Sequence, residues 1–256
     1  MTNSKILPGT ATNPDDHAMP LMDHLEELRS VLIFSLVALL LGAISAYNFH
    51  QELIALLIRP LTELEIKPVI VRATEGFFAA LKVSAFAGLV IASPAILWKI
   101  WSFIVPALYS HERRYVYIFF PFSVLLFLSG VAFSYMTVYP LGVKFLITFG
   151  DFTPMISISE FLGFALTFIL PFGIIFQLPV ILIFLARMGL ITHQLLAKYR
   201  QYALLAMFVI AAVITPTPDI VTQTLMALPM YLLYEISIWM IRLIRPKKKT
   251  LPEDRA

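Results

Sequence analysis

The chain has 256 residues, of which 59% are hydrophobic and only 14% are charged, and its mean hydropathy is +0.85. A soluble domain is nearer half apolar and about a quarter charged, so it could not bury this much apolar surface. Lipid must cover the rest, and we therefore predict a polytopic integral membrane protein. The chain has no cysteine, which excludes disulfides and thiolate metal sites, and its formal net charge is only +3.

Six apolar runs predict membrane-spanning helices, because about 20 helical residues cross a hydrocarbon core of about 30 Å. The fifth run is short, and the sequence TPTPD at 215–219 separates it from the sixth, which favours a helical hairpin. Either the bilayer is thinner or protein shields the hairpin there, or Gln201, Tyr202 and the Thr-Pro segment complete the fifth helix at the interfaces. The predicted spans are residues 31–49, 77–98, 115–138, 161–186, 202–214 and 220–241.

The lysines and arginines beside these runs predict the orientation of the chain. Fourteen of the 19 lie on one side of the membrane and five on the other. Basic residues mark the cytoplasmic side, so both termini are predicted to be cytoplasmic, which agrees with an even number of spans. We expect a disordered cytoplasmic arm at 1–19 without a removable signal peptide, a membrane domain at 20–244, and a basic cytoplasmic tail at 245–256 that contacts anionic lipid.

Prolines within the predicted spans favour a curved, concave bundle, because each proline removes a backbone donor and tends to kink its helix. The alternative is the ordinary enrichment of proline in membrane helices. Residues 51–75 are expected to form an extracytoplasmic cap with short helical pieces. The prolines concerned are Pro94, Pro121, Pro171, Pro179 and Pro229.

Catalytic and metal-binding patterns are not found in the sequence. The five histidines do not have metal-ligand spacing, and HExxH, P-loop and GxSxG motifs are absent. We therefore predict that the protein is not an enzyme and uses no cofactor, metal ion or nucleic acid.

Few polar residues are predicted to lie at membrane depth, where such groups are functional candidates. Asp219 and Gln223 are four apart and share one helix face, although Asp219 also suits a helix N-cap. Gln177 lies inside the fourth span. For Glu235 we favour an ion pair with Arg242, or a position near the interface, over a functional role.

Two carboxylates are predicted at the cytoplasmic surface. Residues 20–29 read as a short amphipathic helix that lies along the membrane before turning into the first span, and this helix carries Glu27. Glu112 lies in the first cytoplasmic connection. A carboxylate binds a guanidinium through two parallel hydrogen bonds, so both could receive a cationic ligand. Alternatively, Glu27 pairs with a neighbouring basic residue, and Glu112 with Arg113 or Arg114.

Several sequence blocks resemble the TatC family of twin-arginine translocase subunits, in the same order, from about residue 19 to residue 244. The blocks are HLEELR at 24–29, SPAILW at 93–98, FIVPALYSHERR at 103–114, FGIIFQLP at 172–179, and TPTPD, QTLMALP and YEI between 215 and 236.

The resemblance implies a glove-shaped bundle of six helices and a receptor for folded precursor proteins that carry twin-arginine signal peptides. It implies TatA- and TatB-like single-span subunits and further copies of this chain as partners, with the protonmotive force as drive. The membrane is then a cytoplasmic membrane, or a thylakoid membrane in a photosynthetic host. The residues implied are Glu27 and Glu112 as partners of the signal arginines, with Arg29, His24 and Phe103 on the same surface, and Pro60, Asp219 and Gln223 in transport or assembly.

Gln177 departs from the family pattern, because many members carry an intramembrane glutamate at this position. Glutamine forms hydrogen bonds but cannot titrate, so it suits a polar anchor for a partner helix rather than a proton relay. Two other functions are considered: a secondary transporter, which should show repeated halves around a midplane site, and a scaffold that organises single-span helices without reading a signal.

Overall fold

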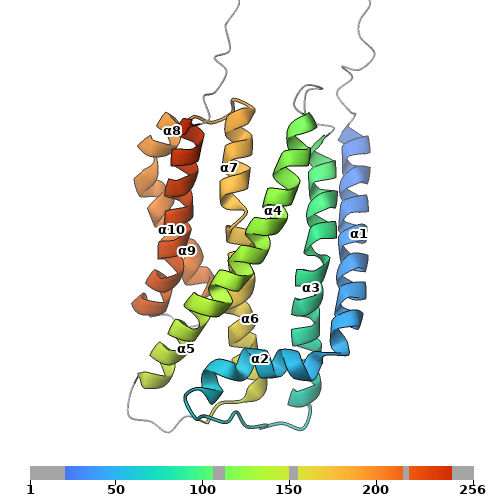
Figure 1. The fold of residues 1–256 in the computed structure, drawn as a ribbon, viewed down its shortest axis with the longest axis vertical. Coiled ribbons are helices and arrows are strands. Elements are labelled where there is room, and N and C mark those ends of the chain that lie inside the picture. Colours follow the sequence, from blue (N-terminus) through green and yellow to red (C-terminus); the bar gives the residue numbers. More distant parts are fainter. Residues whose placement is uncertain (1–20, 106–112, 150–154, 216–218, 244–256) are drawn as a thin grey trace, which may run out of the picture.

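The computed structural model describes residues 21–105, 113–149, 155–215 and 219–243. Within these ranges the chain is helical and has no strand, apart from an isolated parallel bridge between Val69 and Ser157. The predicted arm at 1–19, the tail at 245–256 and Glu112 lie outside them. The elements are α1 (Leu21–Tyr47), α2 (His50–Thr62), α3 (Glu75–Ile104), α4 (Arg113–Phe133), the π-helix η3 (Ser134–Val138), α5 (Tyr139–Thr148), α6 (Ile158–Ile175), α7 (Leu178–Arg187), α8 (His193–Lys198), α9 (Arg200–Ile214) and α10 (Ile220–Leu243) (Figure 1).

Five helical segments in the described part of the chain are long and apolar enough to cross a membrane, and α9 is a shorter apolar helix. Helices α4 and α5 join through η3 into one of these segments, and α6 and α7 form another. Helix α9 has 15 residues, so it is about 22 Å long and falls short of a hydrocarbon core of about 30 Å. It includes Gln201 and Tyr202 but ends before Thr215, so residues flanking the apolar run do not make it full length. These elements confirm the predicted all-helical membrane fold.

Helix α1 corrects one prediction. Residues 20–29 were expected to form a separate surface helix, whereas α1 runs without interruption from Leu21 to Tyr47. Neither proline nor glycine occurs between Leu21 and Leu41, so no residue interrupts the hydrogen-bond ladder. The amphipathic segment is therefore the first part of the span, and it packs beside the last part of α3 (Figure 1).

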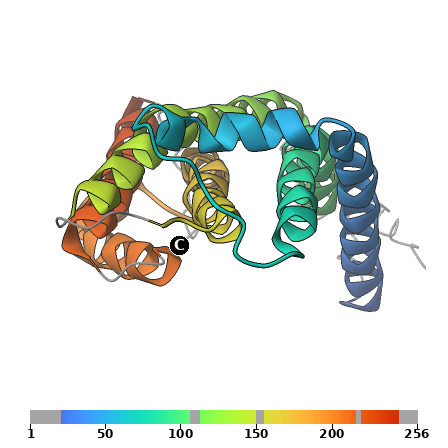
Figure 2. The same ribbon diagram turned by 90° about the horizontal axis from the view of Figure 1, so that it is seen from below.

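The helices follow an arc when viewed along the bundle, with α1 at one end and α9 and α10 at the other (Figure 2). Helix α6 lies in the middle and supplies much of the core, because Leu162, Phe168 and Phe172 are fully buried. Helix α2 lies across one end of the bundle and adds the fully buried Leu61 to the same core (Figure 1). The concave shape predicted from the sequence is confirmed.

Helices α1 and α3 cross at two glycines. A Cβ atom on Gly88 would lie 2.3 Å from the backbone nitrogen of Ala43, and one on Gly42 would lie 2.5 Å from the carbonyl oxygen of Gly88. Only residues without a side chain permit this approach, which resembles the small-residue contacts common between membrane helices. The contact holds α1 against the rest of the bundle.

We expect Gly88→Ala to lower the free energy of unfolding by about 1–3 kcal/mol, because the methyl group would overlap the α1 backbone. Gly163→Ala in α6 is the matched control, since nothing lies within 4 Å of the Cβ atom it would add. Thermal unfolding in detergent, followed by circular dichroism, measures both. Equal midpoints for Gly88→Ala and the wild type would contradict the packing argument.

Candidate functional site

The first part of α1 and the last part of α3 form the first candidate site. The two segments lie side by side because the helices are antiparallel (Figure 1). The ring of His24 stacks on the ring of Phe103, with centroids 4.3 Å apart and planes 19° from parallel. Glu27 follows His24 by about one turn of α1, so the two side chains share a helix face. The structure thus brings together three residues that the sequence implicates.

Glu27 has an unusual environment for a carboxylate. Its Oε2 atom is buried and has no hydrogen-bond partner in the described part of the chain. The alternative that Glu27 pairs with a neighbouring basic residue is not observed for any described residue, and the side chain of Arg29 is exposed. An unpaired buried acceptor is costly, and a guanidinium would satisfy it with a charge-assisted hydrogen bond. This site is chemically suited to receive a cation.

Gln177 lies at the junction between α6 and α7, in the middle of the bundle. Its Nε2 atom donates a hydrogen bond of 2.8 Å to the carbonyl oxygen of Ser123 in α4. The buried indole Nε1 of Trp101 in α3 donates to the hydroxyl of Ser123 at 2.9 Å. Sequence reasoning did not identify Trp101 or Ser123, and a serine within an apolar run was the available signal. The three side chains link α3, α4 and the α6–α7 junction.

Asp219 and Gln223 lie where α9 and α10 meet, at the far end of the bundle from Glu27 (Figure 1). An Asp219 carboxylate oxygen accepts a hydrogen bond from the Thr222 backbone N–H at 2.7 Å, and Thr222 Oγ1 donates to the other carboxylate oxygen. Asp219 therefore caps α10, as its position suggested. Gln223 donates to the carbonyl oxygen of Phe208 at 2.9 Å and ties α10 to α9.

Pro60 is buried near the end of α2 and affects the hydrogen bonding of Leu56, one turn earlier in the helix. Because proline has no N–H, it cannot donate to the carbonyl oxygen of Leu56. The hydroxyl of Tyr135 in η3 donates to that oxygen at 3.0 Å. The neighbouring Tyr139 hydroxyl donates to the carbonyl oxygen of Leu57 at 2.6 Å. Pro60 thus creates an acceptor that anchors α2 to the π-helical segment.

Glu235 corrects the predicted ion pair with Arg242. It pairs instead with Arg200, through two contacts of 2.9 and 3.0 Å, and accepts a hydrogen bond from Tyr231 at 2.8 Å. Arg242 lies seven residues further along α10, which is about 10 Å along the axis. Arg200, at the start of α9, lies beside Glu235 because α9 and α10 pack together.

Comparisons with known proteins extend these observations. The family model for "Sec-independent protein translocase protein (TatC)" matches residues 23–229. The TatC protein of Carboxydothermus hydrogenoformans is 42% identical over 236 residues, which is 91% of this chain and 97% of that protein. The TatC protein of Aquifex aeolicus is 41% identical over 239 residues, covering 91% and 99%. A crystal structure described as the twin arginine translocase receptor TatC superposes with a TM-score of 0.77 at 41% identity, covering 86% of this chain and 98% of that one.

The fold and the comparisons define a multi-pass membrane protein of a protein translocation system, which is not a class of enzyme. The chain belongs to the TatC family of Sec-independent protein translocase proteins. Translocation by this family involves several subunits, so the chain is one component of a larger assembly.

Removing the Asp219 cap should separate its structural role from its charge. We expect Asp219→Ala to lower the free energy of unfolding by about 1 kcal/mol, whereas Asp219→Asn keeps a capping oxygen and stays within a few tenths of the wild type. Thermal unfolding in detergent checks both variants. If Asp219→Asn destabilises as much as Asp219→Ala, the carboxylate contributes through its charge rather than as a cap.

The hydrogen bond that Tyr135 makes in place of the missing Pro60 N–H predicts that substitutions of these two residues have non-additive effects on the free energy of unfolding. Tyr135→Phe should cost about 0.5–1.5 kcal/mol in the wild type, because the Leu56 carbonyl oxygen loses its donor. In a Pro60→Ala background the new N–H reaches that oxygen, so the same change should cost less. A double-mutant cycle of unfolding free energies measures the difference. Additive effects of the two substitutions would contradict this account.

Proposed function

We propose that this protein is the receptor subunit of a twin-arginine translocase, and that it binds the signal peptides of folded precursor proteins. Glu27 and Glu112 pair with the two arginines of the signal. Membership of the TatC family and the likeness to a crystal structure described as the twin arginine translocase receptor TatC support this function. The observation that carries it is the buried Glu27 Oε2 atom without a partner in the described residues.

The surroundings of Glu27 favour arginine as the ligand. A guanidinium offers a planar set of five donors and remains charged, and it can bind a carboxylate through two parallel hydrogen bonds. The stacked rings of His24 and Phe103 form an adjacent rigid wall. Arg29 is exposed on the same helix, two residues after Glu27, so its side chain projects from a different face of α1. Lysine presents a single ammonium group and would match this site less well.

The rest of the bundle serves the later steps. The apolar part of the signal lies along the concave side of the arc, and TatA- and TatB-like single-span subunits and other copies of this chain assemble around it. Gln177 uses its amide N–H for Ser123, which leaves its oxygen to accept a donor from a partner helix. The opposite end of the bundle is stabilised during transport by Pro60, Asp219 and Gln223.

The setting follows from the charge distribution. Both termini and the Glu27 site face the cytoplasm, and α2 faces the other side, in a bacterial cytoplasmic membrane or a thylakoid membrane. The protonmotive force drives transport. A membrane potential supplies about 2.3 kcal/mol per charge per 100 mV.

Site-specific crosslinking of a twin-arginine signal peptide to this protein in native membranes tests the proposal. We expect Glu27→Gln and Glu112→Gln each to reduce the crosslink yield at least about tenfold, since each change leaves a signal arginine without its charged partner. A signal peptide with Lys-Lys in place of Arg-Arg should lose a similar amount.

Glu26→Gln is the matched control, because Glu26 is the exposed neighbour of Glu27 and loses the same charge. It should crosslink like the wild type. If the Lys-Lys peptide and the Glu27→Gln/Glu112→Gln double variant crosslink as well as the originals, the two glutamates are ordinary surface charges. A scaffold that organises single-span helices would then be the better description.

A further inference from the structure

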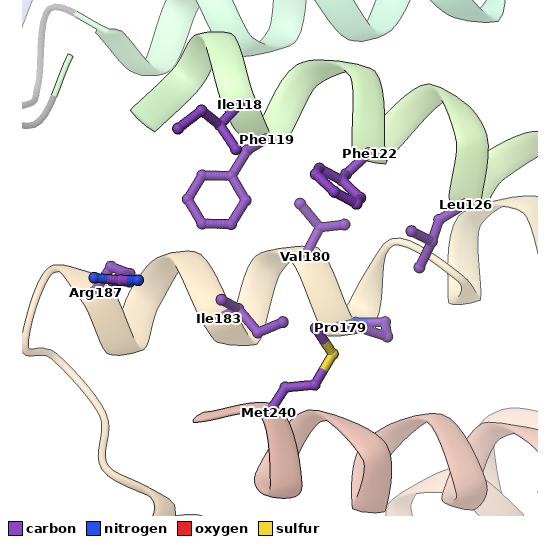
Figure 3. Close-up of a pocket in the computed structure, with 9 residues that line it drawn as sticks. All are labelled: Ile118, Phe119, Phe122, Leu126, Pro179, Val180, Ile183, Arg187 and Met240. Carbon is purple, nitrogen blue, oxygen red and sulfur yellow. The ribbon is translucent and has the colours of Figure 1, made fainter. Parts of the chain in front are cut away.

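A pocket of about 250 Å³ lies between α4, α7 and α10, away from the Glu27 site (Figure 3). Its walls are apolar, with one charged residue, Arg187, at the end of α7. Figure 3 shows that the side chains of α4 face those of α7 across the pocket and that Met240 of α10 approaches from the opposite side. The lining includes Phe119, Phe122, Val180, Ile183, Met240 and Arg187.

The size and chemistry of the pocket restrict its occupant. An apolar pocket in the membrane-spanning part of a bundle is not filled by water, which needs several polar partners. A flexible alkyl chain fits an apolar pocket of this size, and we take it as the occupant.

Arg187 adds a charge requirement at one end. It lies in the last turn of α7 and is exposed, at the end of the bundle where α1 and α4 begin (Figure 1). Arginine near the end of a membrane helix places its guanidinium at the head-group level. A guanidinium binds phosphate through paired charge-assisted hydrogen bonds. Arg187 makes another contact within the chain, and its five donors allow a phosphate in addition.

From this combination we propose that the pocket between α4, α7 and α10 binds an anionic phospholipid, with one acyl chain between the helices and the phosphate held by Arg187. The acyl chain fills the space between α7 and its neighbours α4 and α10, so the bound lipid stabilises the position of α7. This inference is independent of the signal-peptide proposal, because it involves neither Glu27 nor Glu112.

Native mass spectrometry of the purified protein with phosphatidylglycerol or phosphatidylcholine of equal chain length tests the head-group contact. The wild type should retain phosphatidylglycerol about tenfold better, and Arg187→Gln should remove that preference. Arg242→Gln is the matched control, because Arg242 is an exposed arginine near the end of α10 and does not line the pocket. An unchanged preference in Arg187→Gln would overturn the proposal.

A substitution that fills the pocket with a larger side chain tests the acyl-chain contact. Met240→Trp should reduce retention of both lipids, whereas Ile236→Trp, one turn earlier on α10 and outside the lining, should not. Equal retention by Met240→Trp and the wild type would overturn the assignment of the pocket.

Crosslinking in membranes identifies the occupant without altering the buried lining. A photoreactive phenylalanine analogue at Ile118, an exposed residue of the pocket wall, should yield an adduct with the added mass of a phospholipid. An adduct with a signal peptide or a single-span subunit would show that the occupant is a polypeptide, and would refute the proposal. This measurement remains decisive even if a pocket variant fails to fold.

Discussion

Lipid offers no hydrogen-bond partner to the backbone, so each polar group of a spanning segment must be satisfied within the protein. Helices meet this demand except where proline interrupts the ladder. The same loss occurs outside the spans, in α2 at the end of the bundle, where Pro60 leaves the Leu56 carbonyl oxygen without its helical donor and Tyr135 supplies one. Pro94 does the same to Val90, whose carbonyl oxygen accepts a hydrogen bond of 2.7 Å from the adjacent Ser93 hydroxyl. At these two prolines a side chain replaces the lost N–H group, from the same helix at Pro94 and from a neighbouring helix at Pro60.

The same constraint explains how the helices are joined. Side-chain donors reach backbone carbonyl oxygens of other helices: Ser134 to Phe168 at 3.0 Å, Gln177 to Ser123, and Gln223 to Phe208. A carbonyl oxygen has two lone pairs, so it accepts such a bond without losing its helical donor. These contacts fix an open arc rather than a closed cylinder, with the close glycine crossing of α1 and α3 at one end. The concave shape therefore rests on specific polar contacts as well as on apolar packing.

Our two proposals place ligands at two other positions in the described part of the chain. One is the buried Glu27 oxygen beside the His24–Phe103 stack, and the other is the apolar pocket with Arg187 at its end. We propose a guanidinium as the ligand of the first, and an alkyl chain with an anionic head group as the ligand of the second. Both lie toward the end of the bundle that we propose faces the cytoplasm, where the receptor would meet its cargo and the inner lipid leaflet.

The sequence alone determined the membrane class, the number of apolar helices, the short fifth helix and the family, because hydropathy and local motifs depend only on neighbouring residues. It also identified His24, Glu27 and Phe103, which the fold brings to one surface. Only the tertiary structure decided that α1 is continuous from Leu21, that Arg200 rather than Arg242 pairs with Glu235, and that Trp101 and Ser123 belong with Gln177. These outcomes depend on which helices pack side by side. Residues 35 or 54 positions apart in the chain, such as Arg200 and Glu235 or Ser123 and Gln177, leave no local pattern that predicts their contact.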